Sequence, residues 1–75
     1  MNANVAWGRD WAAAIVLTPM QRKVLDGICQ GRSNKEIGRE LGRSEATVKA
    51  HVTAIMRLLG VSNRTQAALV CAGRI

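Results

Sequence analysis

The stretch NKEIGRELGRSEATVKAHV, residues 34–52, constrains the fold of this chain more than any other segment. It holds two segments with helical periodicity and a short break between them. Ile37 and Leu41 recur at i and i+4 before Gly42, and Ser44 can cap the segment that follows. Glycine readily adopts the left-handed backbone conformation that a sharp turn needs. The stretch therefore predicts two helices joined by a tight turn, which is the outline of a helix-turn-helix.

Start and stop signals elsewhere predict two further helices. The sequence TPMQ at residues 18–21 is a capping-box pattern that begins a helix near residue 19, and Gly31 ends it after about residue 30. Ser33 or Asn34 can cap the short second helix, and Gly60 ends a third helix that spans about residues 45–59. Asn63 can cap the last helix. Because no segment alternates in the manner of a strand, we predict an all-α, four-helix domain.

The N-terminal residues 1–16 form a separate extension ahead of the predicted domain at residues 17–75. A chain of 75 residues is one domain, and 48% hydrophobic with 21% charged residues is a globular balance. Trp7, Trp11 and Ile15 stand at i, i+4 and i+8, so residues 5–16 can form a short amphipathic helix. This segment either packs on the first helix or frays, or it forms a docking surface for a second regulatory protein or a second dimer contact.

The positive charge lies mainly in the middle of the chain. The net charge is +6, and seven of the eleven cations fall between residues 32 and 64, where only three acids stand: Arg32, Lys35, Arg39, Arg43, Lys49, Arg57 and Arg64. A basic surface of this kind favours a polyanionic partner, although many small proteins are basic for solubility alone. The position of the charge on the helices therefore has to distinguish these two interpretations.

The third helix has two chemically different faces. Val48, Val52, Ile55 and Leu59 lie at i, i+4, i+7 and i+11 and form a stripe toward the core. The opposite face combines small residues, a hydroxyl and two long cations: Ala46, Lys49, Ala50, Thr53 and Arg57. A helix in a DNA groove needs small side chains where backbones approach and donors near base edges and phosphates. Double-stranded DNA is favoured over RNA because this face presents no aromatic stacking platform.

Side chains that carry enzyme or metal chemistry are few. Cys29 and Cys71 show no C-x-x-C pairing, and His51 alone cannot complete a zinc set, so we expect two free, buried thiols. One histidine and five dispersed acids offer no nucleophile and base at useful spacing, so we expect no enzyme, no metal and no cofactor. The apolar run at residues 11–17 is too short to span a bilayer, and we expect a cytoplasmic protein.

Five motifs occur in the order and spacing of a known family: LTPMQRKVL, SNKEIGREL, TVK-x-H, I-x-x-x-LGV and RTQAA. On these motifs residues 17–70 resemble the LuxR/FixJ-type (GerE-like) helix-turn-helix domain of bacterial transcription regulators. The resemblance implies a four-helix domain that binds double-stranded DNA sequence-specifically, with residues 45–59 as the recognition helix in the major groove. It also implies a homodimer formed through the last helix, and hence an inverted-repeat operator.

The resemblance assigns roles to individual positions. The residues that would face base edges are Lys49, Ala50 and Thr53. Those that would contact the phosphate backbone or brace the helix are Asn34, Lys35, Thr47, His51 and Arg57. The candidates for the dimer interface are Ala67, Ala68 and Cys71.

The chain departs from the family at some positions. Leu58 stands where the family often has a basic residue, and the loss of that cation removes a phosphate contact and makes the salt dependence of DNA binding shallower. Leu58 and the tryptophan-bearing extension favour an alternative, a protein-interaction module that modulates another regulator and binds DNA weakly. The extension is also too short for the receiver or ligand-binding domain common in the family. We therefore expect a stand-alone regulator or a piece of a longer protein.

Overall fold

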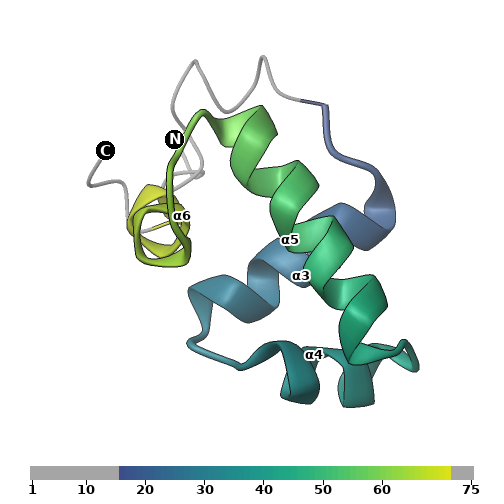
Figure 1. Cartoon of the computed structure of the whole chain (residues 1–75). Helices are drawn as coiled ribbons and strands as arrows, with labels where there is room; N and C mark the ends of the chain where they lie inside the picture. The colour runs from purple at the N-terminus through teal and green to yellow at the C-terminus, as the bar shows by residue number, and fades with distance from the viewer. Residues whose placement is uncertain (1–15, 72–75) are drawn as a thin grey trace, which may run out of the picture.

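A computed structural model describes residues 16–71, which contain four helices and no strand (Figure 1). The helices are α3 (Pro19–Cys29), α4 (Asn34–Leu41), α5 (Glu45–Leu59) and α6 (Arg64–Cys71). These bounds lie within one or two residues of the expected ranges, and the predicted all-α class is confirmed. The expected amphipathic helix at residues 5–16 lies almost wholly outside the described residues.

Local hydrogen bonds and glycines set the ends of the helices. At the start of α3, the Gln21 amide donates to Thr18 Oγ1 over 3.1 Å, and the Thr18 amide donates to Gln21 Oε1 over 3.0 Å, as the capping-box pattern predicts. Ser33 forms the same reciprocal pair with Glu36 and is the N-cap of α4. Asn34 is instead the first residue of that helix. Short-range chemistry therefore accounts for where these helices begin.

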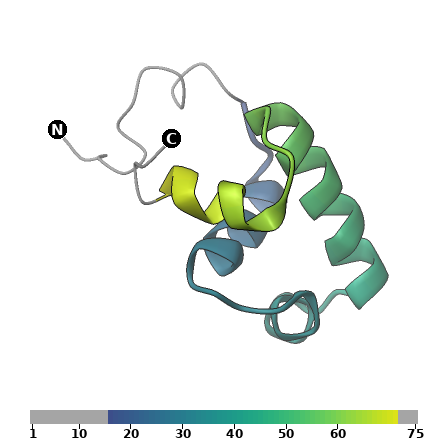
Figure 2. The same ribbon diagram turned by 60° about the vertical axis from the view of Figure 1, so that its left-hand side comes forward.

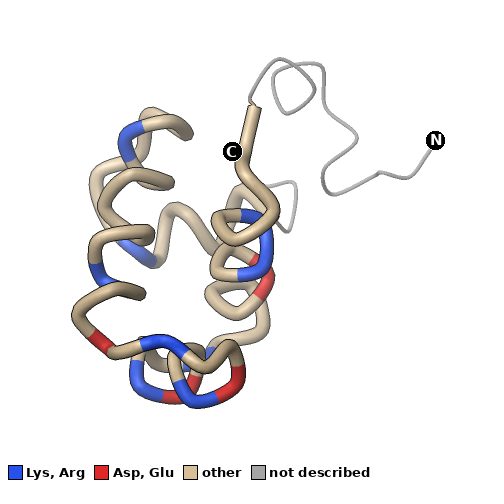
Figure 3. Tube along the Cα trace, turned by 90° about the vertical axis from the view of Figure 1, so that its right-hand side faces the viewer, with Lys and Arg blue, Asp and Glu red and all other residues tan. Residues whose placement is uncertain are grey.

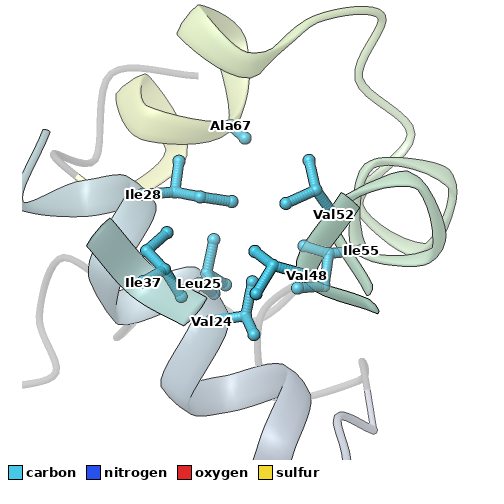
Figure 4. Close-up of a cluster of buried hydrophobic side chains, with 8 residues drawn as sticks. All are labelled: Val24, Leu25, Ile28, Ile37, Val48, Val52, Ile55 and Ala67. Carbon is cyan, nitrogen blue, oxygen red and sulfur yellow. The ribbon is translucent and has the colours of Figure 1, made fainter. Parts of the chain in front are cut away.

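One apolar core joins all four helices, and α3 and α5 supply most of it (Figure 4). Each helix contributes the stripe of its amphipathic pattern, and the buried residues are Val24, Leu25, Ile28, Ile37, Val48, Val52, Ile55, Ala67 and Val70. No polar side chain is buried within the described part of the chain. A core built only from aliphatic side chains depends on close packing, because it has no directional bonds to fix its geometry.

The helices pack around α5. This long helix lies across α3 and also contacts α4 and α6, and α6 packs against α3 as well (Figures 1 and 2). The two helices of the helix-turn-helix thus share the core with the C-terminal helix. None of the helices in residues 16–71 is long and apolar enough to cross a membrane.

The two cysteines are paired, and the expectation of two free thiols is wrong. Cys29 ends α3, Cys71 ends α6, and a disulfide joins them across a sequence separation of 42 residues. Their Cα atoms are 5.9 Å apart, which is in the usual range for a disulfide. Sequence spacing misses this pairing because the contact depends on how α6 packs against α3.

Candidate nucleic-acid interface

The turn between α4 and α5 holds these two helices in a fixed relation. Gly42 has a φ of 69°, and the Arg43 amide donates to the Gly38 carbonyl over 2.9 Å. A Cβ atom at position 38 would lie 2.6 Å from the Arg43 carbonyl oxygen. The turn can therefore fold back onto α4 in this geometry because residue 38 has no side chain.

The N-terminus of α5 is capped from within the turn. Ser44 Oγ accepts a hydrogen bond from the Thr47 amide over 3.1 Å, and its hydroxyl donates to Thr47 Oγ1 over 2.9 Å. Glu45 follows in the first turn, where the helix dipole favours an acid. Thr47 is exposed, but its side chain is engaged in this cap, so the residue also braces the start of the helix.

The buried and the exposed residues of α5 lie on opposite faces of the helix, as its sequence predicts. Val48, Val52 and Ile55 are buried. The residues of the opposite face are all exposed: Ala46, Lys49, Ala50, Thr53 and Arg57. The Thr53 hydroxyl donates to the Lys49 carbonyl over 3.1 Å, so its methyl group and a lone pair remain free to contact a ligand. The structure thus brings the three expected base-contacting residues onto one exposed, firmly supported surface.

The residues expected at the phosphate backbone differ in their surroundings. Lys35, in the first turn of α4, and Arg57, in the last turn of α5, are exposed, and His51 is half-buried on a flank of α5. Asn34 is half-buried, and its side-chain oxygen accepts a hydrogen bond from the Arg64 guanidinium. Asn34 therefore has a structural partner in addition to any role at DNA.

Arg64 is a residue that sequence reasoning missed. It is the first residue of α6, and its half-buried guanidinium donates both to Asn34 Oδ1 and to the Arg32 carbonyl. It thereby ties the start of α6 to the start of α4. The RTQAA motif contains this arginine, but its two acceptors lie 30 and 32 residues earlier in the chain, and spacing alone does not reveal them.

Most of the basic side chains that the structure describes lack an acidic partner. Within residues 16–71 the only ion pair joins Arg32 to Glu40. Basic residues are spaced along α5. They also occur in and around α4, where acidic residues are interspersed with them (Figure 3). Hydrogen bonds from the Ser33 backbone amide and hydroxyl lower the pKa of Glu36, so this acid serves as part of a helix cap. The surface that includes Lys49 and Arg57 thus keeps a positive charge available to a polyanion.

The residues expected at the dimer interface are only partly accessible. Ala67 is 0% exposed because it packs in the chain's own core, while Ala68 and Cys71 are half-buried. Leu69, which sequence reasoning did not select, is 38% exposed and is the large apolar side chain that α6 presents to solvent. No group of metal-ligating side chains in the described region is large enough to hold a metal ion.

Comparison with known proteins gives a consistent result. Residues 15–71 match the family described as bacterial regulatory proteins, luxR family. The chain is 53% identical over 53 residues to the glycerol metabolism activator of Pseudomonas putida and 49% identical over 53 residues to the transcriptional regulatory protein LiaR of Bacillus subtilis (strain 168). Each match covers 71% of this chain but only 24% and 25% of the relative, so the chain spans about a quarter of their length.

A shorter relative is covered over four fifths of its length. The spore germination protein GerE of Bacillus subtilis (strain 168) is 37% identical over 59 residues, which is 79% of this chain and 80% of that protein. No solved structure gives a significant match.

Proposed function

Because this chain belongs to the luxR family of bacterial regulatory proteins, whose domain binds DNA, we propose that it binds a specific double-stranded sequence as a homodimer, with α5 in the major groove. The observation that carries this proposal is the exposed face of α5, opposite three residues that fix the helix in the core. Its site of action would be the bacterial cytoplasm, where the chromosome lies.

The chemistry of this face suits base recognition. Lys49 supplies a long donor for guanine O6 and N7, and Ala50 is small enough to approach a thymine methyl group. The Thr53 hydroxyl donates its hydrogen to the Lys49 carbonyl. The side chain would therefore present an oxygen acceptor and a methyl group to the DNA. At about 1.5 Å per residue, Lys49 and Thr53 are separated by roughly 6 Å along the helix, which is about two base-pair steps.

Phosphate contacts would position the helix without reading sequence. Lys35 and Arg57 are exposed cations at opposite ends of the helix-turn-helix. Thr47 and His51 on α5, and Asn34 at the start of α4, offer further polar groups. Two protomers related by a twofold axis would place two such surfaces on DNA and would select an inverted repeat. Leu69, with Ala68 beside it, is the surface of α6 that we propose for this dimer.

Selection from a pool of random duplex DNA tests the proposal directly. The unchanged protein should enrich an inverted repeat. Lys49→Ala should relax the preference at one position of each half-site, at a cost of about 1–3 kcal/mol. Lys35→Ala is the matched control, since both lysines are exposed but only Lys49 lies on the base-reading face. It should weaken binding to all duplexes about equally and reduce the salt slope by about one unit per contact.

DNA binding without sequence preference would favour a different function for this chain. Weak, sequence-blind binding that both variants reduce equally would refute base readout by α5. The chain would then be better described as a protein-interaction module that modulates another regulator, and the search for its partner would begin with residues 1–16.

A further inference from the structure

The cysteine pair has no place in DNA recognition, yet it joins two segments that are distant in sequence. Cys29 and Cys71 are the only cysteines of the chain, and each is the last residue of a helix. The disulfide attaches the end of α6 to the end of α3. The disulfide can restrict the motion of α6 only if the other contacts of this helix leave it free to move. Those other contacts therefore determine how much the disulfide changes the order of α6.

The core does not require the disulfide. The buried cluster that unites the four helices contains neither cysteine, and both pack at its edge as half-buried residues. The Cys71 sulfur also lies 3.7 Å from the Ala67 carbonyl oxygen, so a thiol at this position has a hydrogen-bond acceptor within its own helix. Both the oxidised and the reduced forms are therefore compatible with the fold.

The helix that the disulfide holds is short. Eight residues form about two turns, and a helix of this length depends on tertiary contacts for its order. Arg64 anchors its first residue, and Ala67 and Val70 are its buried side chains. At the last turn, the disulfide is the covalent attachment, and Leu69 lies two residues before it. The state of the cysteines thus bears directly on the surface proposed for dimerisation.

We propose that Cys29 and Cys71 form a reversible thiol–disulfide site whose oxidation fixes the last turn of α6 against α3 and strengthens homodimerisation and DNA binding. This inference rests on the homodimer of the proposed function. The reactant is a small-molecule disulfide such as glutathione disulfide. The thiolate of one cysteine attacks a sulfur of the reactant and releases one glutathione thiolate, and the second cysteine then attacks the mixed disulfide and releases the other. The protein loses two protons and two electrons, which reduce the reactant to two thiols.

The size of the effect follows from pre-organisation. If the last turn of α6 is ordered in roughly one third of the reduced molecules, a dimer that needs both copies ordered forms about tenfold less tightly than from pre-ordered protomers. Oxidation should therefore lower the dimer dissociation constant by about tenfold. The sequence preference on DNA should stay the same, because the bond does not touch the exposed face of α5.

The test equilibrates the full chain with defined mixtures of reduced and oxidised glutathione. Intact-mass measurement after acid quenching and thiol alkylation reports the internal disulfide, and sedimentation velocity of the same samples reports the monomer–dimer equilibrium. Cys29→Ser and Cys71→Ser are matched controls, since each keeps one thiol and loses the partner. Binding to duplex DNA is measured in both redox states.

The proposal predicts an internal disulfide that forms and opens reversibly, tighter dimerisation of the oxidised protein, and no redox response of either serine variant. Formation of glutathione adducts without an internal bond would overturn it. Equal or weaker dimerisation of the oxidised form would overturn it as well. Failure of the proposed DNA function is a separate outcome, because it would appear as sequence-blind binding in both redox states, whatever the dimer equilibrium shows.

Discussion

Placing a cation at position 58 should steepen the salt dependence of DNA binding. Leu58 is 46% exposed and lies near the end of α5. It follows His51 by seven residues, so the two lie on the same flank of the helix, beside the base-reading face. A lysine there can reach the phosphates along one wall of the groove, and its hydrocarbon stem can retain much of the leucine packing. The cost in folding stability should be about 1 kcal/mol or less.

The magnitude follows from counterion release. Each added phosphate contact changes the slope of the logarithm of affinity against the logarithm of salt concentration by about −0.9. A dimer with Leu58→Lys gains two contacts, so the slope should change by about −1.8. Between 50 and 200 mM salt, the variant should then lose about twelvefold more affinity than the unchanged protein. The term is independent of sequence, so any duplex long enough for the dimer is a suitable ligand.

Fluorescence anisotropy titrations at four or more salt concentrations measure this slope. Val16→Lys is the matched control, because it adds the same charge at a residue that is 86% exposed, ahead of α3 and outside the helix-turn-helix. It should leave the slope unchanged. Equal slopes for the two variants would show that general positive charge acts on DNA and that the flank of α5 makes no phosphate contact, which would refute the docking of this helix as proposed.

Four further outcomes follow from contacts in the structure. Arg64→Lys keeps the charge but loses the planar guanidinium that donates to two acceptors. The free energy of unfolding measured in urea should therefore fall by about 1–3 kcal/mol. An unchanged denaturation midpoint would show that these hydrogen bonds do not anchor α6. Ser44→Ala removes the cap of α5 and should cost about 0.5–2 kcal/mol in thermal unfolding, whereas no change would mean that the cap contributes little. The lowered pKa of Glu36 stabilises the fold above the ordinary glutamate pKa, and this contribution is lost as the pH falls through the folded-state pKa. Glu36→Gln should therefore flatten the plot of folding stability against pH in this range. Plots of the same slope for the variant and the unchanged protein would exclude the effect. Leu69→Glu should shift sedimentation toward the monomer, and an intact dimer would place the interface elsewhere.

The helices of this chain are predictable because their signals are local. Thr18, Ser33 and Ser44 each lie within three residues of the amide that they cap, and the left-handed Gly42 and Gly60 end α4 and α5. Such interactions depend on neighbouring residues and are read directly from spacing. The exposed face of α5 is also local in this sense, because the amphipathic pattern of one helix fixes which side chains point away from the core.

Contacts between distant segments were not predictable in the same way. Arg64 meets acceptors near the start of α4, and Cys29 meets Cys71 across 42 residues. Both contacts depend on how α6 packs against the other helices. A single sequence contains no periodic signal for that packing, so a basic residue in a motif and two isolated cysteines read as separate features.

The position of α6 shows where pattern reasoning reaches its limit. A helix with one clear apolar stripe has a defined rotation about its axis, as α5 does, because only one orientation buries the stripe. The sequence of α6 is apolar nearly all round, so several rotations bury similar area, and the family resemblance placed Ala67 among the outward, dimer-facing residues. In the structure the small Ala67 lies in the core and Leu69 remains exposed. Arg64 anchors the first residue of α6, and Ala67 and Val70 pack in the core, so the helix has this rotation and Leu69 is left as its outward apolar residue.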